Sequence, residues 1–235
     1  NNSKSLKERV EQVCEAIKRI YASTFFIEPK SLIDKISQRM EEEKMAIIIM
    51  EMIGQKHENR FYPTFSGVAQ SYNYYPTSYI KRTDGVAYIA LGLGKTVVDG
   101  EKSIRFCPKY PSLIHQFYSI KSTIDTSQHK FYALDIEIGK NLLLKGENKN
   151  LKHYDLSIAE HDGELKFIGS VIPDNENVLR DSLSYKGIRI TSFSQILKWE
   201  AFPLSNLLKD LLKLGKDSLG CPVEFEFAVN LYKNK

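Results

Sequence analysis

The chain has 235 residues, of which 42% are hydrophobic and 26% are charged. This is enough apolar surface to fold one domain or two small ones without disulfides, which excludes collagen, low-complexity sequence and wholesale disorder. The 33 basic and 29 acidic side chains leave a net charge of +4 that is spread along the chain, so no polybasic tract points to nucleic acid or to an anionic membrane.

The longest apolar run, 45–50, is far shorter than the ~20 residues that cross a bilayer, so we expect no membrane span. The cysteines Cys14, Cys107 and Cys221 are far apart and odd in number, and they form no C-x-x-C pair. Neither a disulfide framework nor a zinc site is therefore expected. A reducing compartment fits this cysteine usage best, and we predict a cytoplasmic location.

The N-terminal part of the chain begins with two predicted helices. Apolar residues recur every three or four positions over 6–21, which places them on one face of a helix. A second helix is predicted from Ser31, as its N-cap, to the acidic run 41–43. The run 45–53 has β-branched residues in its middle and a glycine after it, which is typical of a strand buried on both faces. We expect this strand in the middle of a sheet.

Strands dominate the rest of the chain, separated by Gly, Asn and Asp turn signals. They are predicted at 67–72, 86–91, 104–106, 131–138, 155–159, 165–172 and 188–190. A leucine-rich helix is then expected from Pro203 to a stop at Gly215, followed by a strand over 223–229. Helices early and late with strands between them predict an α+β fold.

A glycine-rich turn, Gly-Leu-Gly-Lys-Thr at 92–96, directly follows the predicted strand 86–91. It lacks the spacing of a phosphate-binding P-loop, which would require a glycine where the chain has Ile89. Small residues at a strand end let a backbone approach a ligand, but they serve equally well for a tight turn against a neighbouring element. The pattern alone leaves both interpretations open.

Two glutamates lie in the last predicted strand. Residues two apart on a strand project to the same side, so Glu224 and Glu226 would be ~6–7 Å apart at the backbone. Such a pair suits a hard divalent cation such as Mg²⁺ that also holds phosphate oxygens. The alternation with Phe225 and Phe227 also fits an ordinary amphipathic strand with its glutamates in water, and the pattern alone favours this interpretation.

No serine-nucleophile signature and no histidine pair with ligand spacing is present, so we assign no catalytic residue to this chain. A cluster of tyrosines, Tyr72, Tyr74, Tyr75 and Tyr79, could stack on a base. Without a basic stripe, however, packing or a partner surface is the better interpretation, and no nucleic-acid partner is expected.

Four segments, taken in chain order, resemble the nucleotide-binding, ATP-grasp domain of phosphoenolpyruvate synthase and pyruvate phosphate dikinase. The apolar run 49–53 is similar to a strand of that family, and Ser-Gly-Val at 66–68 is similar to its next strand. The run 92–100 resembles the family's Gly-Leu-Gly-Glu-x-Val-Val-x-Gly, and 220–227 resembles its Gly-x-Pro turn and Asp-Ile-Glu-Trp strand.

The resemblance implies an ATP-grasp-like fold with a mixed, mainly antiparallel sheet and flanking helices. It covers about 6–109 and 190–230, whereas the strand-rich segment 110–189 matches only in position. The family's phosphate-binding arginine and first-half lysine would precede this region, its Gln-x-Arg strand would follow it, and its phosphohistidine segment has no counterpart. We therefore expect 1–235 to be the C-terminal part, an incomplete half, of a two-lobed nucleotide-binding domain in a longer protein.

The resemblance also implies roles for particular residues. Glu224 and Glu226 take the places of the acidic pair that holds the nucleotide's Mg²⁺, and Lys95 stands where the family has glutamate. The strand 50–53 takes the place of the segment along the adenine. The residues expected to contact ATP are Met50, Glu51, Met52, Ile53, Gly92, Gly94 and Lys95.

The function that the resemblance implies is that of a phosphoenolpyruvate synthase-like phosphotransferase. Such a kinase moves a phosphoryl group from ATP, through a histidine elsewhere in the protein, to pyruvate. This fragment would supply adenine and Mg-ATP contacts, would bind ATP weakly or not at all by itself, and would act with the remaining domains of the same chain. The alternative is a non-catalytic regulatory or interaction module that retains the ATP-grasp fold, which Lys95 and the unmatched 110–189 favour.

Overall fold

The computed structural model describes residues 5–23, 46–136 and 149–232. The chain divides into two units, one made of Asn1–Met52 with Gly139–Glu147 and the other of Ile53–Ile138 with Asn148–Lys235. The predicted helix at 31–43 lies outside the described residues. No helix among the described residues is long and apolar enough to cross a membrane.

The first unit contains α1 (Leu6–Ser23), which confirms the helix predicted from the apolar periodicity. None of its residues is buried. The strand predicted at 45–53 is wrong for the described residues, because 46–54 form no strand and Ile48 and Met50 are each 82% exposed. A strand needs a neighbour to pair with, and no described strand pairs with this segment. An apolar pattern reports side-chain type and says nothing about that neighbour.

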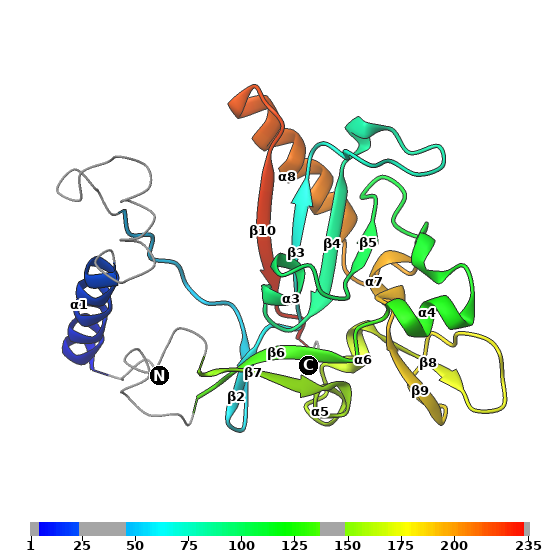
Figure 1. Cartoon of the computed structure of the whole chain (residues 1–235), viewed down its shortest axis with the longest axis horizontal. Helices are drawn as coiled ribbons and strands as arrows, with labels where there is room; N and C mark the ends of the chain where they lie inside the picture. Colours follow the sequence, from blue (N-terminus) through cyan, green and yellow to red (C-terminus); the bar gives the residue numbers. More distant parts are fainter. Residues whose placement is uncertain (1–4, 24–45, 137–148, 233–235) are drawn as a thin grey trace, which may run out of the picture. The chain divides into compact units, whose positions relative to one another are not determined.

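The second unit is built around a four-stranded antiparallel sheet in the order β10 (Glu224–Val229), β3 (Phe65–Gln70), β4 (Val86–Leu91) and β5 (Ile104–Phe106). Figure 1 shows α8 (Leu204–Leu219) running beside these strands. Three buried leucines of α8 share one hydrophobic core with residues of the sheet. Because α8 is amphipathic and the face of the sheet toward α8 is apolar, each element buries the apolar face of the other.

A second four-stranded antiparallel sheet has the order β1 (Gln55–His57), β2 (Arg60–Tyr62), β6 (Lys130–Asp135) and β7 (Leu151–Asp155). A hairpin of β8 (Gly169–Pro173) and β9 (Gly187–Thr191) forms a separate two-stranded sheet. The remaining short elements are η2 (Arg82–Asp84), α3 (Lys95–Val98), η3 (His115–Phe117), α4 (Ile120–Thr126), α5 (Leu156–His161), α6 (Leu165–Ile168) and α7 (Ser194–Leu197). The described fold is therefore mixed α+β with antiparallel sheets.

Two predicted strands are wholly or partly helical. The segment 155–159 falls mostly in α5, and 165–172 is divided between α6 and β8. The buried pairs in these helices, Leu156 with Ala159 and Leu165 with Ile168, are three residues apart. That spacing is helical, but short apolar runs do not distinguish a buried strand from a buried helical turn.

The helix α8 does not stop at Gly215 as predicted. It continues to Leu219 and ends at Gly220, which has a left-handed φ of 68° and donates its N–H to the carbonyl of Lys216. Gly215 instead permits a close approach, because a Cβ there would lie 3.1 Å from Cγ2 of Val223.

Candidate functional site

A cleft of about 920 Å³ lies over one face of the β10-β3-β4-β5 sheet. Its lining residues on β3, β4 and β10 alternate with residues of the hydrophobic core, such as Ala69, Ala87 and Phe225. Because successive residues of a strand point to opposite faces, the cleft lies on the face opposite the core. The sheet thus has one side packed against α8 and one side that is open to a ligand.

The strand register places four cleft residues in one row across the sheet. Glu226 pairs with Val68, Val68 with Tyr88, and Tyr88 with Arg105. Directly paired residues of antiparallel strands share a face, so all four project toward the cleft. The row has a carboxylate at the β10 edge and a guanidinium on β5.

Glu224 lies in the adjacent row, where it pairs with Gln70, so both glutamates of β10 line the cleft. The amide nitrogen of Gln70 donates a hydrogen bond to Oε2 of Glu224. Glu226 is exposed, and its side chain forms no ion pair within the described residues. The described part of the chain contains no group of three or more Asp, Glu, His or Cys that could hold a metal ion. The pair would therefore need oxygens from a ligand and from water to complete the coordination of a divalent cation.

Arg105 is fixed by neutral groups. Its Nε donates to the hydroxyl of Tyr88 at 3.1 Å. One Nη2 hydrogen-bond partner is Oδ1 of Asn73 at 3.0 Å, and another is the carbonyl oxygen of Tyr75 at 2.7 Å. Asn73 is only 3% exposed, so the guanidinium is anchored on a buried part of the cleft wall.

The glycine-rich turn divides into a glycine that the fold requires and one that it does not. Gly92 has a φ of 82°, and a Cβ there would lie 2.6 Å from the carbonyl oxygen of Tyr132. At Gly94 the φ is −59°, and the atom nearest to an added Cβ would be Cβ of Ser66, at an ordinary 3.7 Å. Packing therefore explains Gly92, in line with the tight-turn interpretation, and leaves Gly94 without a structural reason.

Lys95, the first residue of α3, forms an ion pair with Asp99 at 2.7 Å and lies 5.8 Å from the ring centroid of Tyr132. Neither Lys95 nor the two glycines line the cleft, which is bordered instead by the later residues Val97 and Val98. The structure thus brings the glutamate pair into the cleft and does not bring this part of the turn there.

The predicted adenine segment is exposed and has no regular secondary structure. Met50, Glu51 and Met52 belong to the first unit, and Ile53 begins the second unit. Their contact with a nucleotide stays a prediction.

Sequence reasoning missed two residues of the cleft, Tyr88 and Arg105. A signal was available, because each alternates with buried neighbours inside a correctly predicted strand. Alternation gives the face of one strand, but the register that aligns Tyr88 with Arg105 and Glu226 depends on pairing between strands.

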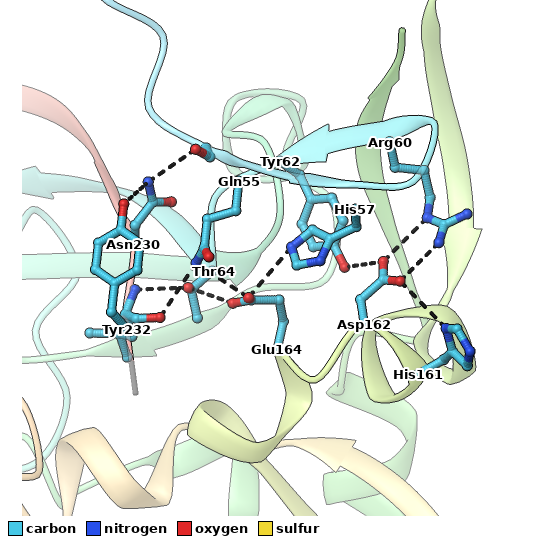
Figure 2. A network of polar contacts seen from close by, with 12 residues as sticks. Gln55, His57, Arg60, Tyr62, Thr64, His161, Asp162, Glu164, Asn230 and Tyr232 are labelled. Carbon is cyan, nitrogen blue, oxygen red and sulfur yellow. Dashed lines mark hydrogen bonds and ion pairs between the residues drawn. The ribbon is translucent and has the colours of Figure 1, made fainter. Parts of the chain in front are cut away.

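A second cluster of charged groups lies apart from the cleft, around β2 and the turn after α5 (Figure 2). Arg60 donates to Asp162 at 2.8 Å, and the hydroxyl of Tyr62 donates to the same carboxylate at 2.6 Å. Burial alone would raise the pKa of Asp162, but the hydrogen bonds from Arg60 and Tyr62 outweigh it and hold the pKa below its ordinary value. Burial, followed by the bond to Asp162, raises the pKa of Tyr62.

Glu164 lies in the same cluster and behaves differently. It accepts a hydrogen bond from Thr64 at 2.6 Å and lies 3.5 Å from Nε2 of His57. Burial raises the pKa of Glu164 against the lowering effects of Thr64 and His57. Thr64 also accepts the backbone N–H of Leu231, so this cluster ties the segment after β10 to the β1–β2 hairpin.

The chain matches the model of a known protein family. A family model described as the pyruvate phosphate dikinase AMP/ATP-binding domain matches residues 6–235. The chain belongs to this family. The matched range includes 110–189, where the sequence alone offered no motif. No curated protein and no solved structure matches the chain.

Proposed function

We propose that the chain binds a magnesium-complexed adenine nucleotide in the cleft over the β10-β3-β4-β5 sheet. The observation that carries the proposal is that Glu224 and Glu226 both line a cleft in a chain that belongs to an AMP/ATP-binding domain family. The domain would be ATP-grasp-like and would form the C-terminal part of a nucleotide-binding domain in a phosphoenolpyruvate synthase-like phosphotransferase.

The charges of the cleft support a metal-bound nucleotide over a free one. Among the described residues, four carboxylates line it, and only two permanently basic side chains, Lys102 and Arg105, do so. A bare polyphosphate would be repelled by this excess of negative charge, whereas a divalent cation between carboxylates and phosphates turns repulsion into attraction. When bound, Mg²⁺ would offset the negative charge of the β and γ phosphates.

The residues of the proposed site then have separate tasks. Glu224 and Glu226 would hold the cation, and the hydrogen bond from Gln70 would orient the Glu224 carboxylate. Gly94 and the segment 50–53 do not line the cleft, and the nucleotide contacts expected of them stay a prediction. The phosphohistidine and the pyruvate site would be supplied by other parts of a longer cytoplasmic protein.

An NMR titration tests the proposal, because it detects even the weak binding expected of an incomplete domain. Mg-ATP should shift resonances of the cleft, and ATP with excess chelator should shift them much less. Glu226→Gln should weaken Mg-ATP binding by about tenfold or more, since a charged ligand to the cation is lost. Asp210→Asn, which removes an exposed carboxylate of α8 outside the cleft, should leave binding unchanged.

Equal binding by the wild type and Glu226→Gln would remove the glutamate from the site. A wild-type chain with no response to Mg-ATP at saturating concentration would instead count against nucleotide binding by 1–235.

The second candidate function is a non-catalytic regulatory or interaction module with the same fold. It is favoured by Lys95, which replaces a family glutamate and is engaged with Asp99 within α3 and its C-cap. The absence of any nucleotide response, both in this chain and in the longer natural protein, would support this alternative.

A further inference from the structure

We propose that Arg105 binds a phosphate group of the nucleotide, at the side of the cleft opposite the glutamate pair. The inference rests on the proposed function and adds a residue that the family resemblance does not supply. Arg105 and Glu226 occupy the same row of the sheet, separated by Val68 and Tyr88. Three strand spacings put their backbones about 14 Å apart. Both side chains line the cleft between them, so one extended ligand can meet both.

The charge of Arg105 is not offset by the protein. Its acceptors are a phenol hydroxyl, an amide oxygen and a backbone carbonyl, and among the described residues no carboxylate forms an ion pair with it. The arginines with a structural role in this chain behave differently. Arg60, Arg180 and Arg189 each bond a carboxylate within 3 Å.

Arg105 also keeps hydrogen-bonding capacity. A guanidinium has five N–H donors in a planar fork, and the bonds to Tyr88, Asn73 and Tyr75 use Nε and Nη2. Within the described chain, Nη1 has no acceptor. The two N–H groups of Nη1 are thus left for an anion, on a guanidinium whose orientation the other three bonds fix in advance.

The competing explanation is that Arg105 only fastens the loop around Asn73 and Tyr75 to β5. That role would affect every ligand of the cleft to the same extent. Phosphate binding would affect ligands according to whether they carry phosphate, which gives the two explanations different experimental results.

The test is an NMR titration of wild type and Arg105→Gln with Mg-ATP, magnesium triphosphate and adenosine. We expect Arg105→Gln to bind Mg-ATP and magnesium triphosphate about tenfold or more weakly, because charge-assisted hydrogen bonds to phosphate are lost. Adenosine binding should not change. Arg105→Lys, which keeps the charge without the fork, should recover part of the loss.

Lys102→Gln is the matched control, because it removes the same charge from an exposed position in the same cleft. Its effect on Mg-ATP should be at most about threefold, as is usual for a solvent-screened charge. Thermal unfolding of each variant shows whether Arg105→Gln is folded. If it is not, Arg105→Lys is compared with Lys102→Gln instead, by the loss of affinity for Mg-ATP and magnesium triphosphate relative to adenosine.

The outcomes separate this inference from the proposed function. Suppose that the wild type binds Mg-ATP. If Arg105→Gln then binds Mg-ATP equally well, or if its affinities for adenosine and for magnesium triphosphate fall to the same extent, Arg105 is not a phosphate ligand, while the proposed function stands. If the wild type binds triphosphate through Arg105 but shows no preference for ATP, the anion site stands and the nucleotide assignment fails. If the wild type binds neither Mg-ATP nor magnesium triphosphate, the inference about Arg105 and the proposed function are both overturned.

Discussion

The cleft and the buried cluster of Figure 2 contain the same kinds of side chain in opposite circumstances. In the cluster, Arg60 and Asp162 have side chains that are 9% and 3% exposed, and they satisfy each other. In the cleft, Glu226 and Arg105 lie in one row, separated by Val68 and Tyr88, and they form no ion pair with each other. Charges that the protein pairs internally hold the fold together, whereas charges that it positions without a counter-charge are available to a ligand.

The largest effect that would test this contrast is expected from Asp162→Ala. It leaves Arg60 buried without its main partner and removes the acceptor of the Tyr62 hydroxyl, so it should lower the free energy of unfolding by about 3–5 kcal/mol. Urea denaturation measures the loss. Glu58→Ala is the control, because Glu58 contacts the same arginine from a position that is 69% exposed, and it should cost less than about 1 kcal/mol. Similar losses from both variants would show that burial does not separate the two kinds of charge.

A smaller effect is expected from alanine substitutions at the two glycines of the turn after β4, which should differ in their cost to stability. Gly92→Ala meets the carbonyl of Tyr132 and adopts a left-handed φ, so it should lower the free energy of unfolding by about 1–3 kcal/mol. Gly94→Ala has ordinary backbone angles and an ordinary contact with Cβ of Ser66 at 3.7 Å, so it should change that free energy by less than about 0.5 kcal/mol. Thermal unfolding of both variants checks the difference. Equal destabilisation would mean that the fold also requires a glycine at 94.

The smallest effect concerns pH and Glu164. The folded-state pKa of this carboxyl is raised above 4.5, its ordinary value, chiefly by burial. Ionisation therefore costs more in the folded than in the unfolded state, and stability falls as the pH rises from 4.5 through the folded-state pKa, then stays level. Glu164→Gln removes this dependence, so its free energy of unfolding relative to wild type should increase over that pH range.

Urea denaturation at several pH values measures this difference between the two proteins. Repeating it in a His57→Gln background removes the neighbouring imidazole, which lies 3.5 Å from the Glu164 carboxylate. A difference that stays constant with pH, or that shrinks as the pH rises, would contradict a raised pKa at Glu164.

Local pattern predicted the elements of the second unit that form the cleft. The strands β3, β4, β5 and β10 were found within about two residues, because each has enough alternation or apolar content of its own. The hairpin of β1 and β2 was missed, since Gln55–His57 contains no apolar residue and Arg60–Tyr62 does not alternate as β5 does. The segment 46–53 failed for a different reason, because pairing depends on a partner that its own sequence does not contain.

The candidate site was predictable to the same limited extent. The period of a strand places Glu224 and Glu226 on one side of β10, and both do line the cleft. Their binding of a cation stays a prediction, as do the roles of Gly94 and the segment 50–53. Arg105 could not be linked to the glutamates from sequence, because three strand pairings separate them.

Gly67 and Phe227 are paired residues of β3 and β10, and the phenyl ring occupies the volume that a side chain at 67 would need. A Cβ at 67 would lie 2.5 Å from the ring's Cζ and also 2.5 Å from the carbonyl oxygen of Tyr88, so both a side chain and the backbone exclude it. Shortening the aromatic alone leaves the backbone clash, and glycine at 67 is therefore required whatever residue stands opposite it. In a double-mutant cycle, Phe227→Leu should relieve only part of the cost of Gly67→Ala.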